Sequence, residues 1–249
     1  KRHSSQPDCN WGWDSHRECY FFGYHLYIYV ASDSYSDLPV FPLLERASRH
    51  DMLSFLHSFF TMKAYLPQFR IEKLLLDSAH DAYAVYEYCR QENITPFIDL
   101  NPGHTGHFTY KDDFTIDEDG VPICKLGLRM HKDGYEAAKH RAKYRCPKAN
   151  RKQGCFCEHP CSPAKYGRTV HIFTADNPRL FNIPPRDSTA WKREYDGRTS
   201  VERSNKREKE DYKLEDGRHR STKMWYCRLY GIMMLQHLDA WEMPSVEAF

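Results

Sequence analysis

Apolar and polar positions in the first part of the chain alternate in patterns that predict two strands and a helix. Residues Cys19–Ala31 run CYFFGYHLYIYVA, an alternating and β-rich stretch that predicts a strand. Leu38–Leu44 (LPVFPLL) predicts a second strand, weakened by its prolines. Apolar residues recur at helical spacing over Asp51–Tyr65, so a helix is expected there.

The next apolar runs predict a strand, a helix and another strand. Ile71–Leu76 (IEKLLL) is expected to be a short buried strand that ends at Asp77. His80–Arg90 has a helical pattern, and Pro96–Leu100 (PFIDL) predicts a second buried strand. A βαβ unit of these lengths places its two strands parallel in one sheet. Because ligands bind beyond the carboxyl ends of such strands, Asp77 is expected at a functional edge.

Two further acids are expected near that edge. Asp81 is expected either to support the site around Asp77 or to cap the following helix. Asp99 ends the neighbouring strand and is expected to lie close behind the site.

The character of the chain changes at about Gly103 and changes back at about Pro185. Gly, Pro, Lys, Arg and Cys dominate this segment, with short strand-like pieces at Val121–Leu128 and Arg168–Thr174. A β-rich subdomain inserted into the rest of the fold is therefore expected.

Two helices are expected after the insertion. The first begins near Asp187 or Ser188, both good N-cap residues, and continues to about Tyr212. The second is amphipathic and covers Thr222–Trp241.

Composition is that of a globular protein, and the pattern divides it into three segments. Hydrophobic residues make up 41% and charged residues 28% of the chain, which excludes a disordered protein. Residues 1–102 are expected to form the first part of an α/β core and residues 103–185 the β-rich, Cys-containing insertion. Residues 186–249 are expected to supply the helices that complete the core.

The sequence carries no sign of a membrane or secretory segment. No apolar run approaches the roughly 20 residues that cross a bilayer, and the polar segment Lys1–Gln6 is followed by no apolar stretch. A cytoplasmic protein without a membrane partner is therefore expected. Since the chain does not start with Met, it is expected to be a piece of a longer protein, cut on its N-terminal side.

A charged helix is predicted to place four chemically useful residues on one face. At about 100° per residue, one narrow stripe carries Tyr195, Arg198, Glu202 and Lys209. A carboxylate flanked by cations and a phenol suits a site where the acid holds a divalent ion and the other groups hold phosphate. The alternative is a solvated helix whose Arg198 and Glu202 form an ordinary ion pair.

The spacing of these residues, Tyr-x2-Arg-x3-Glu-x6-Lys, resembles the motif of a large group of bacterial insertion-sequence transposases of the DDE class. Two further blocks occur in the order that this family has. Gly23–Leu26 is similar to its Gly-Tyr-Lys-x-His strand, and LLLDSAHDAY resembles the strand that ends at its second catalytic acid. By this resemblance Asp77 is the second acid and Glu202 the third, and the blocks span roughly Trp11 to Trp241.

The resemblance implies an RNase H-like fold, in which a mixed sheet flanked by helices carries three acids that bind Mg²⁺ or Mn²⁺. Asp77 and Glu202 would be two catalytic, metal-binding acids of a DNA transposase, which cleaves phosphodiesters and transfers strands at insertion-sequence ends. Arg198 and Lys209 would neutralise DNA phosphates, and Tyr195 would donate a hydrogen bond there. The implied partners are double-stranded DNA, both transposon ends and target, and a second copy in a homodimeric synaptic complex. The implied location is the bacterial nucleoid.

The first acid of the family pattern has no clear counterpart. Asp14 lies too close to the next strand to end a preceding one, and Asp8 lies in a polar stretch with no strand before it. The first acid and its strand are therefore expected to precede Lys1, and the chain by itself is expected not to catalyse strand transfer. Two alternatives stay open: a catalytically dead, transposase-derived DNA-binding protein, and an RNase H-like nuclease.

Four of the nine cysteines crowd into one short segment of the insertion and form a candidate zinc site: Cys146, Cys155, Cys157 and Cys161. Four thiolates suit tetrahedral Zn²⁺, although the spacing is not the paired C-x2-C of common zinc ribbons. His159 could replace one of them. The alternative is four reduced thiols in a loop.

Basic residues surround these cysteines. The net charge is only +2, so a nucleic-acid partner must meet a local basic patch. Glu158 is the only acid expected to offset the patch, which is therefore predicted to lie on DNA phosphates. The predicted contacts are Lys143, Arg145, Lys148, Arg151 and Lys152.

Overall fold

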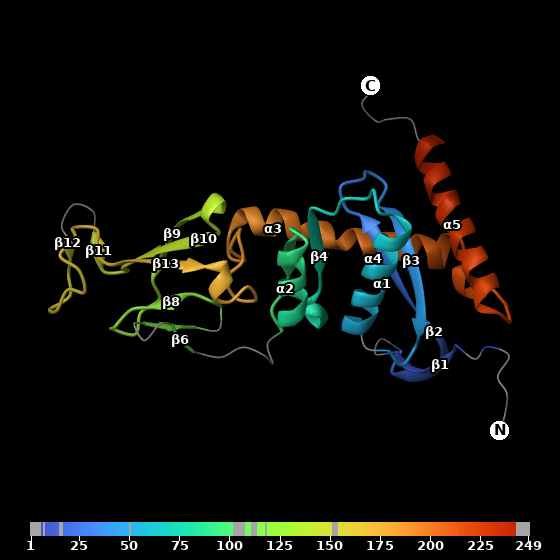
Figure 1. The fold of residues 1–249 in the computed structure, drawn as a ribbon, viewed down its shortest axis with the longest axis horizontal. Helices are drawn as coiled ribbons and strands as arrows, with labels where there is room; N and C mark the ends of the chain where they lie inside the picture. Colours follow the sequence, from blue (N-terminus) through green and yellow to red (C-terminus); the bar gives the residue numbers. More distant parts are fainter. Residues whose placement is uncertain are drawn as a thin grey trace. The chain divides into compact units, whose positions relative to one another are not determined.

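The computed structural model describes residues 6, 8–14, 17–49, 51–101, 108–110, 114–117, 119–150 and 154–242. These residues form a mixed α/β protein with several small sheets and helices (Figure 1). Contacts group the chain into two compact units. Unit 1 holds Lys1–Arg70 and Asp196–Phe249, and unit 2 holds Ile71–Tyr195. Each unit is described by itself.

Unit 1 is built on a three-stranded antiparallel sheet with the order β1-β2-β3. The first predicted strand is confirmed as β2 (Cys19–Ala31), and the second is confirmed as β3 (Leu38–Arg46). Their register runs from Tyr24 opposite Arg46 to Ala31 opposite Leu38. The prolines of β3 do not prevent the pairing, because β3 stands at the edge of the sheet, where a strand tolerates a missing N–H donor.

The edge strand β1 (Asn10–Asp14) pairs with the start of β2 and is not predicted by the hydrophobic pattern. It is too short to show a clear alternation. Cross-strand aromatic pairs stabilise it, with ring centroids 5.5 Å apart for Trp11 and Phe22 and 4.9 Å apart for Trp13 and Tyr20. Its last residue, Asp14, therefore ends an edge strand that neighbours β2. The expectation that Asp14 lies too close to the next strand to end a preceding one is wrong, because four residues are enough to join the two strands.

Two helices pack their apolar side chains against this sheet. Helix α1 (Asp51–Tyr65) has the bounds that its apolar spacing predicts, and α5 (Thr222–Glu242) confirms the last predicted helix. The buried apolar side chains described on α1 are Phe55, Phe59 and Met62. On α5, Leu229, Ile232 and Met233 form one apolar cluster with Ile28 of β2. Each such side chain contributes about 1.5–3 kcal/mol by leaving water, so these contacts hold unit 1 together.

The turn between β2 and β3 is tied to the charged helix α4 (Thr199–Lys206) through Asp37. Arg203 donates two hydrogen bonds to the Asp37 carboxylate, at 2.6 and 2.7 Å, and Arg207 donates to the Asp37 carbonyl oxygen at 3.0 Å. The hydrogen bonds from Arg203 hold the pKa of Asp37 below its ordinary value. This turn therefore fixes α4, and with it Glu202, on the sheet of unit 1.

The region after Ser188 is not one regular helix. Helix α3 (Thr189–Tyr195) follows Ser188, whose hydroxyl accepts a hydrogen bond from the Trp191 N–H at 3.1 Å, as expected of an N-cap. A 3₁₀ turn at Asp196–Arg198 precedes α4, and Arg207–Asp211 is π-helical. The predicted extent of the helix, to about Tyr212, is therefore confirmed, although its turns are of three kinds. A 3₁₀ turn advances about 120° per residue and a π turn advances less than an α turn, so the uniform 100° spacing behind the predicted stripe does not hold across these turns.

Unit 2 contains the predicted βαβ unit, and its parallel pairing is confirmed. Strands β4 (Lys73–Leu76) and β5 (Thr95–Ile98) pair in parallel, with Leu76 opposite Ile98. Between them lie a 3₁₀ turn at Ser78–His80 and helix α2 (Tyr83–Gln91), which packs beside the strands (Figure 1).

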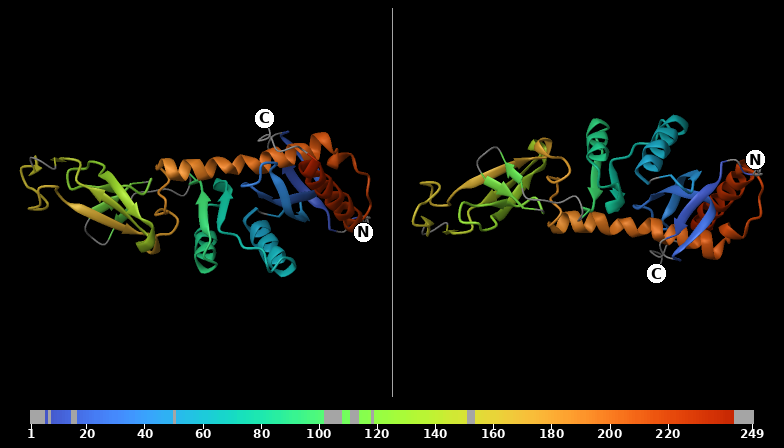
Figure 2. Two further views of the ribbon diagram at one scale, coloured as in Figure 1. Left: turned by 90° about the horizontal axis from the view of Figure 1, so that it is seen from above. Right: turned by 90° about the horizontal axis from the view of Figure 1, so that it is seen from below.

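The segment predicted as a β-rich insertion forms small sheets around its own core (Figure 2). The sheet β6-β7-β8 consists of Phe108–Tyr110, Phe114–Ile116 and Pro122–Ile123. The sheet β13-β10-β9 consists of Thr169–Phe173, Arg141–Arg145 and His131–Glu136, and β11 (Ala149–Asn150) pairs with β12 (Gly154–Cys155). The predicted strand at 168–174 is confirmed as β13. The one at 121–128 is confirmed only as far as β8, because a turn follows.

Buried polar contacts join the segment after β13 to the βαβ unit. The fully buried Asp81 carboxylate accepts hydrogen bonds from Arg179 at 2.5 Å, the Tyr86 hydroxyl at 3.0 Å and the Asn101 N–H at 2.7 Å. Arg186 donates to the Ile98 carbonyl oxygen and to the Tyr86 hydroxyl, both at 2.8 Å. Helix α2 has Ala82, not Asp81, as its N-cap. Asp81 therefore fastens the unit internally, and residues 71–102 group with the predicted insertion 103–185.

Candidate functional site

Asp77 lies at the carboxyl end of β4, where the chain leaves the parallel pair. Its carboxylate accepts a hydrogen bond from the Ala79 N–H at 3.1 Å and lies 2.7 Å from Nδ1 of His80. The Asp77 side chain is 55% exposed, whereas His80 is buried. The buried ring thus orients an acid whose oxygens border solvent, and such oxygens are the hard ligands that Mg²⁺ prefers.

A second acid leaves the sheet at the same edge. Leu76 stands opposite Ile98 in the parallel register, so Asp77 and Asp99 each follow one member of that pair. Asp99 is also exposed. Since neighbouring strands lie about 4.8 Å apart, the two acids emerge side by side at the edge where ligands of parallel sheets bind.

Glu202 lies on α4, which rests on the sheet of unit 1. Its side chain is 58% exposed, and its Oε1 lies 2.9 Å from a guanidinium nitrogen of Arg198, one helical turn earlier. This is the ion pair that a solvated helix would also form, and an exposed pair of this kind contributes only about 0.3–0.5 kcal/mol to stability. The carboxylate is therefore accessible and weakly held.

The other two residues of the predicted stripe have different surroundings. Lys209 lies in the π-helical segment, where its Nζ is 3.3 Å from Glu215. Tyr195 stacks on Trp191 with ring centroids 4.5 Å apart. Tyr195, like Asp77, belongs to unit 2, while Arg198, Glu202 and Lys209 belong to unit 1. Within unit 1 the structure brings Arg198 and Glu202 into contact.

A buried polar cluster lies on the π-helical segment, where the sequence suggests no site. Glu208 is fully buried, its Oε1 accepts a hydrogen bond from Nε2 of Gln236 at 3.3 Å, and the Ser204 hydroxyl donates to Oε1 of Gln236 at 3.4 Å. Burial raises the pKa of Glu208 to about 7, although Gln236, Lys209 and Arg207 act in the opposite direction. The only feature of the sequence that hints at this cluster is the i,i+4 spacing of Ser204 and Glu208.

The stability of the protein is expected to fall as Glu208 ionises. Because its folded-state pKa lies above the ordinary value, its contribution is complete below about pH 4.5 and is lost as the pH rises through 7. A shift of this size corresponds to about 3 kcal/mol. Glu208→Gln keeps the shape and cannot ionise, so urea unfolding at pH 4.5 and 7 should lose this pH dependence. Glu210→Gln, at an exposed neighbour, is the control that should keep it; an unchanged pH slope in Glu208→Gln would contradict the assignment.

The predicted basic patch is partly neutralised by the neighbouring strand. On β10, Nζ of Lys143 lies 2.9 Å from Asp133 of β9, and Nε of Arg145 lies 3.6 Å from the same carboxylate. The expectation that Glu158 alone offsets the patch is therefore wrong, because sheet pairing supplies an acid from elsewhere in the sequence. Lys148 is exposed. The remaining predicted contacts, Arg151 and Lys152, lie outside the described residues.

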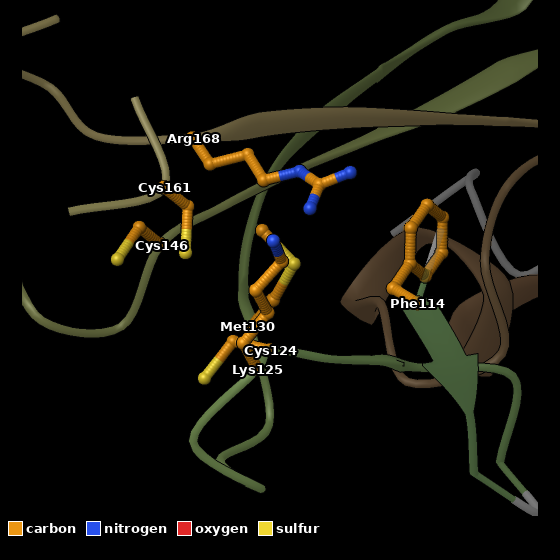
Figure 3. A pocket seen from close by; sticks show the side chains of 7 residues that line it. All are labelled: Phe114, Cys124, Lys125, Met130, Cys146, Cys161 and Arg168. Carbon is orange, nitrogen blue, oxygen red and sulfur yellow. The ribbon is translucent and has the colours of Figure 1, made fainter. Parts of the chain in front are cut away.

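Of the four cysteines of the predicted zinc site, two line a common pocket, Cys146 and Cys161. Cys146 is buried directly after β10, Cys157 is half-buried and Cys161 is exposed, while the side chain of Cys155 lies outside the described part of the chain. Cys124, which the prediction leaves out, lines one pocket with Cys146 and Cys161 (Figure 3). Within the described ranges, no three His, Cys, Asp or Glu side chains are grouped so as to hold a metal ion.

No family model, curated protein or solved structure matches this chain. In the part of the chain that the structure describes, no helix has the length and apolar character needed to cross a membrane. Function is therefore argued from Asp77, Glu202 and their surroundings.

Proposed function

We propose that this chain belongs to the catalytic core of a DNA transposase with an RNase H-like fold. The observation that carries the proposal is the exposed carboxylate of Asp77 at the carboxyl end of β4, in a parallel pair whose other strand is followed by exposed Asp99. The resemblance of the Tyr195-to-Lys209 spacing adds Glu202, an accessible acid on a helix anchored to an antiparallel sheet. An antiparallel sheet, a parallel βαβ unit and C-terminal helices are elements of such a fold, although its single mixed sheet is represented here by two separate sheets of the described strands.

Asp77 and Glu202 are the proposed ligands of Mg²⁺ or Mn²⁺, which would activate water or a DNA 3′-hydroxyl and stabilise the leaving oxygen. Both side chains are more than half exposed, so their oxygens can reach an ion without opening a core. His80 keeps Asp77 oriented through the 2.7 Å contact. On binding the ion, the Glu202 carboxylate would give up its ion pair with Arg198. The released guanidinium would then bind a DNA phosphate through two hydrogen bonds.

Double-stranded DNA, as transposon ends and as target, is the proposed partner. Lys209 and Lys148 are exposed cations that could meet phosphates, with Arg198 close to the reacting strand. Tyr195 is proposed to donate a hydrogen bond from its stacked position on Trp191. The working form is proposed to be a homodimer in the bacterial cytoplasm, at the nucleoid.

The first acid stays unassigned. Asp14 ends the edge strand β1, and Asp8 accepts a hydrogen bond from the Thr222 hydroxyl at 2.9 Å. Neither position follows a strand that pairs with β4, whose sheet partner among the described strands is β5. The proposal therefore assigns two of the three acids.

A strand-transfer assay tests the proposed function. The protein, as its gene encodes it, is incubated with Mg²⁺ or Mn²⁺, the DNA that flanks the gene and a supercoiled plasmid. We expect metal-dependent cleavage of the flanking DNA and covalent joining of its ends to the plasmid. Cleavage without joining would favour a nuclease, and salt-sensitive DNA binding without either reaction would favour a catalytically dead DNA-binding protein. Absence of both DNA binding and DNA cleavage would overturn the proposed function and both alternatives.

DNA binding by the chain from Lys1 to Phe249 is measured alongside. Its affinity is expected to fall as the salt concentration rises, because binding depends on phosphate contacts. Clear activity of this chain that is lost in Asp14→Ala would make Asp14 the first acid.

A further inference from the structure

We propose a structural Zn²⁺ site in unit 2, held by the thiolates of Cys124, Cys146 and Cys161 with a fourth from Cys157. The site differs from the cluster that the sequence suggests, because it recruits Cys124 from the turn after β8. It stands independently of the proposed DNA chemistry, since no catalytic acid takes part.

The three cysteines come from different segments and line one pocket. Cys124 follows β8, Cys146 follows β10, and Cys161 lies in the loop that leads to β13. The pocket is lined by these thiols together with Phe114, Lys125, Met130 and Arg168. In Figure 3 the cysteines lie on one side of the pocket and Phe114 on the other. Sequence separation is therefore no obstacle to a shared ion.

Tight turns hold two of these cysteines. The Cys124 N–H donates to the Leu128 carbonyl oxygen at 2.8 Å, and the Gly127 N–H donates back to the Cys124 carbonyl oxygen at 2.9 Å. Gly127 has φ 73°, a left-handed value that favours glycine. The Cys146 N–H donates to the Arg168 carbonyl oxygen at 2.8 Å, which ties the end of β10 to the start of β13. Two ligand backbones are thus already in place.

The loop that carries Cys161 returns against Cys146 at a glycine. Gly167 has φ 73°, and a Cβ there would lie 2.7 Å from the Cβ of Cys146 and 2.6 Å from that of Ala149. Only glycine permits such a close approach. The approach brings the loop that carries Cys161 against the turn that follows Cys146, which is what a shared ion requires.

The charges around the pocket suit a tetrathiolate site. Four thiolates around one Zn²⁺ carry a net charge of about −2. Lys125 and Arg168 line the same pocket and would offset that charge. The Arg168 guanidinium lies 5.7 Å from the ring centroid of Phe114, across the pocket from the cysteines. Two positively charged side chains in the same pocket as three thiols therefore suit a zinc–thiolate centre, whose net charge is negative.

Binding would need the loop before β13 to move toward the two turns, because the thiols are not yet grouped to hold an ion in the described residues. Residues 156–168 contain neither helix nor strand. The buried core of this part of the unit is formed by the two small sheets, and Cys124 only packs at its margin. The free energy of zinc binding adds to the free energy of folding. The ion would therefore stabilise a loop, residues 156–168, none of which belongs to the apolar core.

Metal content and Co²⁺ spectra test the site on the full chain. The purified protein is expected to contain about one zinc ion per chain, and Co²⁺ should replace it with the intense visible absorption of a tetrahedral thiolate site. Cys124→Ser, Cys146→Ser, Cys157→Ser and Cys161→Ser should each lose the zinc and the Co²⁺ spectrum. Cys19→Ser and Cys227→Ser, at exposed thiols of unit 1, should keep both.

The Cys124 variant separates this site from a cluster confined to residues 146–161. Full zinc content in Cys124→Ser, or in Cys157→Ser, would overturn the proposal. Where a variant does not fold, the unaltered chain decides: zinc-free protein that gives no tetrahedral Co²⁺ spectrum on titration would also overturn it. Failure of strand transfer has no bearing on any of these results.

Discussion

Replacing Asp81 with alanine is expected to lower the free energy of unfolding by about 3–5 kcal/mol. The Asp81 carboxylate is fully buried and accepts hydrogen bonds from Arg179, from the Tyr86 hydroxyl and from the Asn101 N–H. Arg179 is itself only 13% exposed, so the variant leaves a buried guanidinium without its carboxylate. Urea unfolding followed by circular dichroism measures the change.

Asp77→Asn is the matched control for this prediction. Asp77 is close to Asp81 in sequence but 55% exposed, and asparagine can also accept the capping hydrogen bond from Ala79. Its unfolding free energy should change by no more than about 0.5 kcal/mol. Equal losses in the two variants would show that burial does not distinguish the two acids.

On the proposed function, Asp77→Asn and Glu202→Gln are each expected to slow metal-dependent strand cleavage by about a thousandfold. An amide cannot supply the negative charge that a divalent ion requires, and metal-held charge stabilisation amounts to several kcal/mol, at about 1.4 kcal/mol per tenfold in rate. Single-turnover cleavage of flanking DNA by the protein as its gene encodes it measures the effect. DNA affinity should change little, because these acids do not neutralise phosphates.

Glu210→Gln is the control for the acid variants. Glu210 lies in the same charged region, is 64% exposed and is 3.8 Å from Lys206, and the proposal gives it no contact with metal or DNA. Its cleavage rate should stay within about twofold of the unaltered protein. Normal cleavage by Asp77→Asn or by Glu202→Gln would remove that residue from the proposed site.

Elements with strong local patterns are predicted well. Helix α1 has the predicted bounds, and β4 and β5 pair in parallel as the βαβ pattern requires. The pattern does not predict β9 (HKDGYE) or β10 (RAKYR), whose residues are largely polar or charged. These strands form because Ala142 and Tyr144 of β10 reach the core while charges pair across the sheet. Neither reason is visible in a short stretch of sequence.

The candidate site likewise has one part that the sequence predicts and one part that it does not. A buried run followed by Asp77 predicts an acid at the end of a strand, and the structure confirms that position. The stripe through Glu202 depends on one regular helix, and the 3₁₀ and π-helical segments interrupt it. Backbone irregularities of this kind depend on what each turn packs against. Ser204 of α4 and Glu208 of the π-helical segment are buried. No pattern in the sequence predicts their burial.

The amino-acid sequence by itself determined the α/β class, the parallel βαβ unit and the position of Asp77 at its edge, because apolar periodicity reports burial within a single element. Only the tertiary structure decided that Asp81 is buried against Arg179, that Asp133 offsets Lys143, and that Cys124 lines the same pocket as Cys146 and Cys161. Each of these contacts joins residues of different elements or loops. Whether an acid stays exposed for a metal or is buried against a guanidinium depends on which distant segment folds over it.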